Sequence, residues 1–357
     1  MKISFVMVGL KDHSTGGYYF NFKMAEALSS AGHEVDVIHF KTIPEKLRGA
    51  RVSGSFYVLK RVLRYKPDLL VVSKSYSFMA PLRIIIPFLR LPVLYMVHHL
   101  EWHDRARGVS NVRKRIVRWF LSCGNRIWVN SRSTADDVTS LGIPEKRLFV
   151  IPPGFDRFET DLNTKQLPVK ILSAGTVCSR KDQLTLVKAC ALLEERDFHL
   201  FITGDETVDR NYAEMVRREA DSLGDKVTFM GHLSTGELYE LYSKSHILAN
   251  LSHWEGYGIA VAEAMWAGLP VVAVDAGAVP ELVTHGYNGY LTAPADAEGC
   301  AEHLKELIDN ERLREGMSRS ARKKAQDLFS WNDTGREFVN LAQETAGCKI
   351  WRNKPGK

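Results

Sequence analysis

Short apolar runs alternate with longer amphipathic segments along the whole chain. In the first half, helical segments separate the strands that this pattern predicts, at residues 3–8, 34–40, 69–73, 93–97, 126–129 and 148–151. The alternation begins again after Pro168, with strands predicted at 170–174, 198–203 and 227–230 and helices at 184–195 and 212–223. Such alternation is typical of parallel sheets covered by helices, so we expect an α/β protein with two open sheets in series.

The segment 158–168 is polar and lies where the first alternation stops. We therefore expect a linker there, which separates an N-terminal Rossmann-like domain at 1–165 from a second one at 166–330. Ligands of open α/β sheets bind beyond the carboxyl ends of the strands. The cleft between two such domains facing each other is therefore the expected binding site.

Composition excludes several classes of protein. With 45% hydrophobic and 25% charged residues among 357, the chain can bury a large core and is not disordered. The five cysteines are an odd, scattered set without a CxxC pair, which indicates neither a disulfide framework nor a zinc site. The longest apolar stretch, 81–97, contains two arginines and three prolines, and the first apolar run lacks a cleavage pattern. We expect a cytoplasmic protein without a transmembrane helix.

The net charge of +6 hides a strong asymmetry. Residues 1–168 hold 26 Lys and Arg against 14 Asp and Glu, a balance of +12, whereas residues 169–357 have a balance of −6. A basic half is typical of proteins that meet an anionic surface, and equally of ordinary solvated helices. No nucleic-acid module with interleaved aromatic residues is present, so nucleic acid is not expected as a partner.

The segment 111–122 is strongly basic and has the pattern of an amphipathic helix. One helical face carries Val112, Ile116, Trp119 and Phe120, and the other carries Lys114, Arg115 and Arg118, with Arg105 and Arg107 just before the segment. Such a helix suits an anionic membrane surface, at the inner face of the cytoplasmic membrane. The same pattern also describes a helix that packs on its own domain with a solvated outer face.

The most informative stretch is 255–270, where a glycine-containing loop leads into a helix and then into the apolar strand 271–274. Gly256 and Gly258 let the backbone approach a ligand, and the unsatisfied N–H groups of the helix start form a site for phosphate oxygens. Glu255 and Glu263 flank this anion site. Carboxylates accept hydrogen bonds, so their role would be to bind hydroxyl groups of a phosphorylated sugar or nucleotide. Alternatively, Glu263 is a dipole-favoured helix acid and Glu255 a surface residue.

Glu255 and Glu263, within EGYGIAVAEAMWAGLPVVAVDAGAVPELV, resemble the E-x7-E signature of glycosyltransferase family 4. These are retaining enzymes of the GT-B fold, in which two Rossmann-like domains face each other across a cleft. The resemblance extends over nearly the whole chain, through STGGYYFNFKMAEALSSAGHEVDVI, YMVHHLEW, VNSRSTADDVTSLGIPEKRLFVIPPGFD, AGTVCSRKDQLTLVKA and HGYNGYLTAPAD, in the order that the family has. It implies that the closing segment 331–357 crosses back to the N-terminal domain.

The resemblance implies a role for each matching residue of the second half. Glu263 would bind the ribose hydroxyls of a nucleotide diphosphate sugar, and Glu255 would bind hydroxyls of the transferred sugar. The backbone that meets the diphosphate or the sugar would be that of Gly256, Tyr257, Gly258 and Ile259. Lys181 would neutralise the charge on the departing diphosphate. The family commonly has an arginine directly after the glycine here occupied by Gly175, whereas this chain has Thr176, so Arg180 would substitute for it.

In the first half, Gly16 and Gly17 match the glycine loop that approaches the donor phosphate, although glycine pairs also form plain tight turns. His98 matches the active-site histidine, whose ring contacts the sugar near the reacting carbon. The catalytic residues implied are thus His98, Glu255 and Lys181. A histidine at a strand end is otherwise more often structural.

The implied reaction is the transfer of a hexose from a UDP- or GDP-linked sugar to a hydroxyl of a glycan or a lipid-linked saccharide, with retention of the anomeric configuration. No Asp-x-Asp pair occurs in the chain, and such pairs commonly hold the metal ion of metal-dependent transferases. We therefore expect neither a metal ion nor another cofactor. Two alternatives remain open: a sugar-nucleotide epimerase of similar fold, and a catalytically weak protein that binds sugar nucleotides or glycans.

Overall fold

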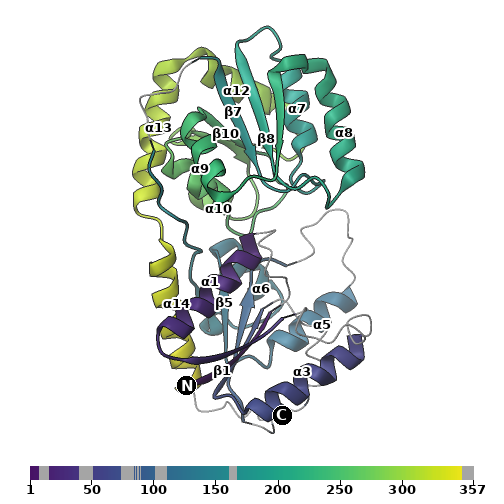
Figure 1. Cartoon of the computed structure of the whole chain (residues 1–357), viewed down its shortest axis with the longest axis vertical. Helices are drawn as coiled ribbons and strands as arrows, with labels where there is room; N and C mark the ends of the chain where they lie inside the picture. Colours follow the sequence, from purple (N-terminus) through teal and green to yellow (C-terminus); the bar gives the residue numbers. More distant parts are fainter. Residues whose placement is uncertain are drawn as a thin grey trace. The chain divides into compact units, whose positions relative to one another are not determined.

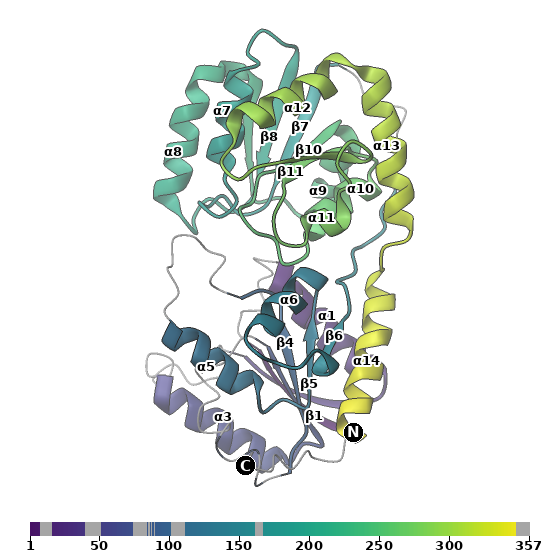
Figure 2. The same cartoon turned by 180° about the vertical axis from the view of Figure 1, so that it is seen from behind.

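The computed structural model describes residues 1–7, 16–39, 51–73 (side chains from 56), 84, 86, 88, 90–100, 111–160 and 167–347. These residues form two compact units (Figures 1 and 2). The first contains the described residues up to Gly154 and those from Trp331 onward, and the second contains Phe155 to Ser330.

The first unit is built on a parallel sheet with the strand order β2-β1-β3-β4-β5-β6. Its strands are β1 (Lys2–Met7), β2 (Glu34–Ile38), β3 (Leu69–Ser73), β4 (Val93–Val97), β5 (Arg126–Val129) and β6 (Leu148–Val150). Its described helices are α1 (Gly16–Ser30), α3 (Arg51–Tyr65), α5 (Asn111–Leu121), α6 (Arg132–Ser140), the short 3-10 helix η4 (Glu145–Arg147) and α14 (Trp331–Gly347). All six strands predicted for this half are confirmed, with ends that differ by one or two residues.

The helices of the first unit divide between the two faces of the sheet. The chain moves in one direction across the sheet from β1 to β2 and in the opposite direction from β2 onward. Right-handed crossovers therefore place α1 on one face and α3, α5 and α6 on the other (Figures 1 and 2). Helix α14 packs on α1, where Trp331 contacts Tyr19 edge to face, with 5.3 Å between ring centroids.

The second unit is a parallel sheet with the order β12-β11-β10-β7-β8-β9. Its strands are β7 (Val169–Ala174), β8 (Phe198–Thr203), β9 (Val227–Gly231), β10 (Ile247–Asn250), β11 (Val271–Val274) and β12 (Gly289–Thr292). Its helices are α7 (Gln183–Ala191), α8 (Arg210–Ala220), η5 (Asp221–Lys226), α9 (Thr235–Lys244), α10 (Ile259–Trp266), α11 (Val279–Leu282), α12 (Ala297–Asp309) and α13 (Glu311–Gln326). Counted from β7, this is the Rossmann order 3-2-1-4-5-6 in reverse. The predicted α/β class is confirmed in both units.

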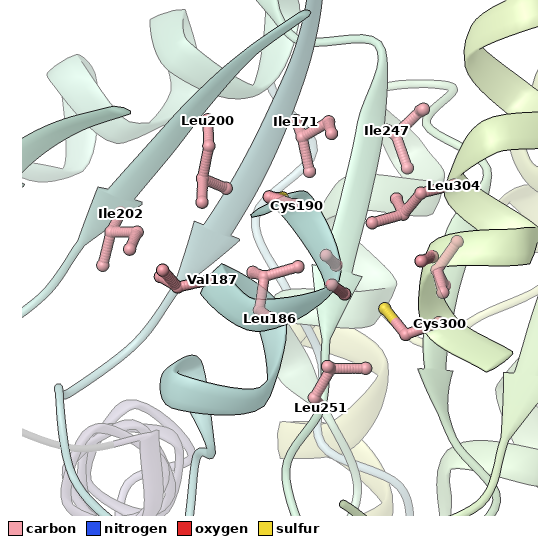
Figure 3. Packing of buried hydrophobic residues seen from close by; sticks show 14 of the residues in the cluster. Ile171, Leu186, Val187, Cys190, Leu200, Ile202, Ile247, Leu251, Cys300 and Leu304 are labelled. Carbon is pink, nitrogen blue, oxygen red and sulfur yellow. The ribbon is translucent and has the colours of Figure 1, made fainter. Parts of the chain in front are cut away.

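Apolar side chains from α7 and α12 close over one face of this second sheet (Figure 3). Leu186 and Cys190 from α7 and Leu304 from α12 pack with strand residues such as Ile171 and Ile247, and all five are at most 1% exposed. The core holds the sheet rigidly, so the loops at its edge start from fixed positions. The four described cysteines are free thiols, and Cys348 lies outside the described residues.

Some boundaries differ from the sequence pattern for identifiable reasons. The predicted helix 212–223 begins at Arg210, where the Asp209 side chain accepts a hydrogen bond from the Tyr212 N–H. The two units separate between Gly154 and Phe155, and Phe158 of the expected linker stacks on Tyr239 at 4.1 Å. The linker residues 161–166, the basic residues 105 and 107 and the tail 351–357 lie outside the described residues. None of the described helices is long and apolar enough to cross a membrane.

Candidate functional site

The strand order of the second unit reverses between β7 and β10. Strands β8 and β9 lie beyond β7, whereas β11 and β12 lie beyond β10. Loops that follow two such neighbouring strands diverge, and ligands of open α/β sheets bind at this point. The loop after β7 contains Arg180 and Lys181, and the loop after β10 contains Glu255, Gly256 and Gly258. The topology therefore brings the predicted donor-binding residues of this unit to one edge of the sheet.

Lys181 and Glu255 form a buried ion pair at this edge. Lys181 Nζ lies 2.5 Å from Glu255 Oε1, and the two side chains are 14% and 12% exposed. Arg180 Nη1 lies 3.8 Å from the same oxygen. Burial alone raises the pKa of the Glu255 carboxyl, but the charges of Lys181 and Arg180 outweigh it and lower the pKa to about 2. Glu255 is therefore ionised at neutral pH, and in this structure it accepts a hydrogen bond from Lys181.

Two glycines make room for this ion pair. Gly175 has φ +139°, and a Cβ atom there would lie 3.2 Å from Lys181 Cε and 3.3 Å from Nζ. Gly277 has φ +61°, and its Cβ atom would lie 2.3 Å from the Glu255 carbonyl oxygen, which also accepts a hydrogen bond from the Ala278 N–H at 2.9 Å. A side chain at either position would displace Lys181 or Glu255, since both the space and the backbone conformation require glycine.

Three polar contacts tie the two loops together beside the ion pair. His253 Nε2 lies 2.8 Å from Asp182 Oδ2, and the His253 backbone N–H donates to the Arg180 carbonyl at 2.9 Å. Arg180 Nη1 donates to the Trp254 carbonyl, also at 2.9 Å. Because Asp182 follows Lys181 directly and His253 lies two positions before Glu255, these contacts fix the geometry of the ion pair. Arg180 thus lies beside Glu255, and its substitution for the missing arginine stays a prediction.

Helix α10 begins as the sequence predicts. Gly258 is its N-cap residue, with φ +98°, and the first helical residue is Ile259. The Gly258 carbonyl accepts from the N–H groups of Val261 and Ala262, and the earlier N–H groups of a helix have no acceptor within it. The Tyr257 side chain is 6% exposed and belongs to the apolar core, so Tyr257 offers a ligand mainly its backbone. The unpaired N–H groups at the start of α10 form an arrangement that favours anion binding.

Glu263 differs from Glu255 in its ionisation. Its only neighbouring donor that the structure shows among the described residues is the Tyr242 hydroxyl, 3.3 Å from Oε2. Burial, opposed only by this hydrogen bond, raises the Glu263 pKa to about 8. The sequence pattern predicts that both carboxylates act as acceptors. In this structure Glu263 is mainly protonated at neutral pH, and only Glu255 is a fixed negative charge.

The strand order of the first unit reverses between β1 and β3; Gly16 and Gly17 come after β1, and His98 comes after β4, the neighbour of β3. His98 follows β4 directly and is 8% exposed. Its Nε2 lies 2.8 Å from Asn21 Oδ1 and 3.3 Å from Ser73 Oγ, and Ser73 donates to the same Asn21 oxygen at 3.0 Å. Because Asn21 Oδ1 accepts, His98 Nε2 carries a proton. The two contacts hold the imidazole in one orientation.

The glycine pair lies next to this histidine. A Cβ atom on Gly17 would lie 3.9 Å from His98 Cγ, so the start of α1 lies against the imidazole ring. Phe20 and Trp128 pack edge to face on the same ring, at 5.3 Å and 5.1 Å between centroids. Gly16 is exposed at the first position of α1, and residues 8–15 before it lie outside the described residues.

Several residues that build the site carried no signal in the sequence analysis. Asp182 and His253 are 71 positions apart, and nothing in the pattern pairs them. Asn21 did give a usable signal, since it is a polar residue among the buried positions of α1. Gly277 also gives a usable signal, because it is a glycine in the loop that follows the buried strand β11. Among the described residues, no three His, Cys, Asp or Glu side chains gather in a way that could hold a metal ion.

Comparison with known proteins gives two family matches that together cover most of the chain. Residues 16–157 match the model of Glycosyltransferase Family 4, and residues 155–324 match that of Glycosyl transferases group 1. The D-inositol 3-phosphate glycosyltransferase of Corynebacterium efficiens is 30% identical over 72% of this chain and 68% of its own. An uncharacterized glycosyltransferase of Methanocaldococcus jannaschii is 25% identical over 96% and 97%. The structure of Anabaena HepE in complex with UDP-glucose is similar over 96% of this chain and 100% of its own, with a TM-score of 0.77 and 20% identity.

Proposed function

Because the chain belongs to the group 1 glycosyl transferases of family 4, with their GT-B fold, we propose that it moves a hexose from a UDP- or GDP-linked sugar to a hydroxyl group, with retention of configuration. The acceptor is a glycan or a lipid-linked saccharide, and the reaction takes place in the cytoplasm. The observation that supports this best is the buried Lys181–Glu255 pair at the strand reversal of the second unit.

In the proposed reaction, the bond between the anomeric carbon and the diphosphate oxygen breaks, and a bond to the acceptor oxygen forms on the same face. The proton of the acceptor hydroxyl passes to the departing phosphate oxygen, so the atoms and charges balance without a protein base. Lys181 stabilises the negative charge that develops on the diphosphate, together with Arg180 and the first N–H groups of α10. No metal ion is needed in this scheme, because these groups supply the positive charge.

The remaining residues position the donor. Glu255, ionised and fixed, accepts hydrogen bonds from hydroxyls of the transferred sugar, and Glu263 binds the ribose. His98 is assigned to the sugar near the reacting carbon, and the backbone of Gly16 and Gly17 to the phosphate. The UDP-glucose in the complex of the similar Anabaena protein supports a nucleotide sugar as donor.

The test is donor turnover. We expect the protein, incubated with a panel of UDP- and GDP-sugars without acceptor, to hydrolyse one of them slowly, and EDTA to leave this rate unchanged. Lys181→Met and Glu255→Gln should each reduce the rate by at least a hundredfold, since one buried charge near the reacting group contributes on the order of 3 kcal/mol. Lys188→Met, at an exposed position of the neighbouring helix α7, is the matched control.

A different experimental result would reject each part of the proposal. Loss of turnover in EDTA would reject the metal-free scheme. Wild-type turnover in Glu255→Gln would reject the role of that carboxylate. Binding of a sugar nucleotide without turnover, with or without candidate acceptors, would identify a binding protein, and a changed sugar on an intact nucleotide would identify an epimerase.

A further inference from the structure

Helix α5 does not bury the apolar face that the sequence pattern gives it. Of that face only Phe120 is buried, beside Leu121, whereas Val112, Ile116 and Trp119 are 63%, 49% and 43% exposed. The three exposed residues are spaced i, i+4 and i+7, so they form one stripe, about 120° around the helix from the buried side. The helix thus packs on its own domain through Val117, Phe120 and Leu121, but these three apolar positions stay exposed to solvent.

Helix α3 has the same character. Its inner side, with Val58, Leu59 and Val62, joins the core of the first unit, whereas Phe56 and Leu63 are 57% and 40% exposed. Phe56 and Leu63 lie two helical turns apart on the outer side. Lys60, which is exposed, lies between them, and Arg64, also exposed, follows Leu63. The helix thus presents aromatic, aliphatic and basic side chains to solvent together.

The two helices cover the same face of the sheet, as the crossover rule requires (Figures 1 and 2). Between β3 and β4, the described residues Ile84 and Phe88 are 62% and 82% exposed, while Ile86 joins the core that α3 and α5 cover. We define the outer-helix surface by its seven exposed apolar residues: Phe56, Leu63, Ile84, Phe88, Val112, Ile116 and Trp119.

The charged residues within α3 and α5 themselves are all basic. The two helices hold eight Lys and Arg residues and no Asp or Glu, and one of the eight, Arg61, is paired with Asp36 of β2. On α5, Arg113 and Arg115 flank the apolar stripe on its two sides, and both are exposed. A partner must therefore offer anionic groups at the level of the basic side chains and an apolar layer beyond them. A bilayer with anionic headgroups has this layered chemistry, whereas a nucleic acid offers no apolar layer.

We propose that the outer-helix surface binds the first unit to anionic lipid bilayers, with the apolar stripe of α5 inserted among the headgroups. A helix stripe of exposed apolar residues that basic residues flank is typical of an interaction site. Donor hydrolysis does not depend on this surface, since none of these residues belongs to the donor site.

The test is flotation of the full chain with vesicles. We expect the protein to float with vesicles of phosphatidylcholine and phosphatidylglycerol, and to bind at least tenfold more weakly to phosphatidylcholine alone. The double variant Val112→Glu/Ile116→Glu should reduce binding to the anionic vesicles by at least tenfold. Met215→Glu on α8 of the second unit is the matched control, because Met215 is 51% exposed and Arg217 and Arg218 follow it closely, and it should bind like the wild type.

The outcomes separate the proposal from its competitors. Equal binding to both vesicle types, or wild-type binding by the double variant, would overturn it. A concentration-dependent dimer that the same variant abolishes, without vesicle binding, would instead identify a second copy as the partner. The double variant should keep the wild-type melting temperature, which shows that it is folded. It should also keep wild-type donor hydrolysis in the absence of lipid, so this experiment is distinct from the test of the proposed function.

Discussion

The unusual protonation of Glu263 gives a prediction about stability. Its pKa is about 8 in the folded protein and about 4.5 in an unfolded chain. Between these pH values the unfolded chain has lost a proton that the folded chain keeps, so the free energy of unfolding falls as the pH rises. In Glu263→Gln this dependence should disappear, because the amide does not ionise and can still accept from the Tyr242 hydroxyl.

The expected magnitude follows from the same numbers. At about 1.4 kcal/mol for each pH unit, a pKa that rises from 4.5 to about 8 corresponds to an upper limit of ~5 kcal/mol. Relaxation of the protein around the ionised carboxylate makes the actual destabilisation smaller than this limit. We therefore expect Glu263→Gln to be about 2–5 kcal/mol more stable than the wild type at pH 9. At pH 4, both side chains are neutral in the folded state and the two proteins should differ by less than about 1 kcal/mol.

Urea denaturation at pH 4, 7 and 9 measures this difference, which should grow steadily with pH. Glu302→Gln, at an exposed position of α12, is the control and should show no such growth. A difference that is the same at pH 4 and pH 9, or a variant that is less stable than the wild type at pH 9, would refute the raised pKa and with it the assignment of a protonated Glu263.

Three further predictions concern the same loops. Gly277→Ala should destabilise the protein by about 2 kcal/mol or more and abolish donor hydrolysis, because its Cβ atom would lie 2.3 Å from the Glu255 carbonyl oxygen. Calorimetry and the turnover assay check this. The control is Gly236→Ala, in open space on α9, which should keep the stability and the turnover of the wild type. His253→Ala should lower kcat at least tenfold with little change in melting temperature, whereas His253→Gln, which keeps a donor toward Asp182, should recover most of the rate; equal loss in both variants would argue against a positioning role. Binding of UDP at pH 7 should release a proton, because ribose hydroxyls that donate to Glu263 favour its ionised form; calorimetry in two buffers of different ionisation enthalpy would contradict this if the heats agreed.

Much of the architecture could be predicted because it depends on local patterns. The β–α alternation predicted the parallel sheets, and the glycines before 259 predicted the start of α10. The ionisation states of individual side chains depend instead on residues that are distant in the sequence. The pKa of Glu255 is set by Lys181, 74 positions earlier in the chain, and that of Glu263 by burial beneath α9 residues such as Tyr242. A sequence pattern shows two equivalent carboxylates, and only the packing distinguishes them.

The pattern was also incomplete for α5. Helical periodicity grouped Val112, Ile116, Trp119 and Phe120 on one face, because each is apolar and the spacing fits. The core of the first unit contacts the helix along the neighbouring side, through Val117, Phe120 and Leu121. Periodicity gives the direction of an apolar face but does not say whether the protein itself covers that face.

The position of α14 in the first unit has a consequence for biosynthesis. The second unit is one continuous stretch, 155–330, so all of its strands have left the ribosome before the last helix is made. The first unit, in contrast, needs Trp331 and the rest of α14 to cover the aromatic side chains of α1. During synthesis, the domain that is translated first should therefore be the last to reach its final packing, and chains that stop before 331 would expose Tyr19 and Phe20 to chaperones and proteases.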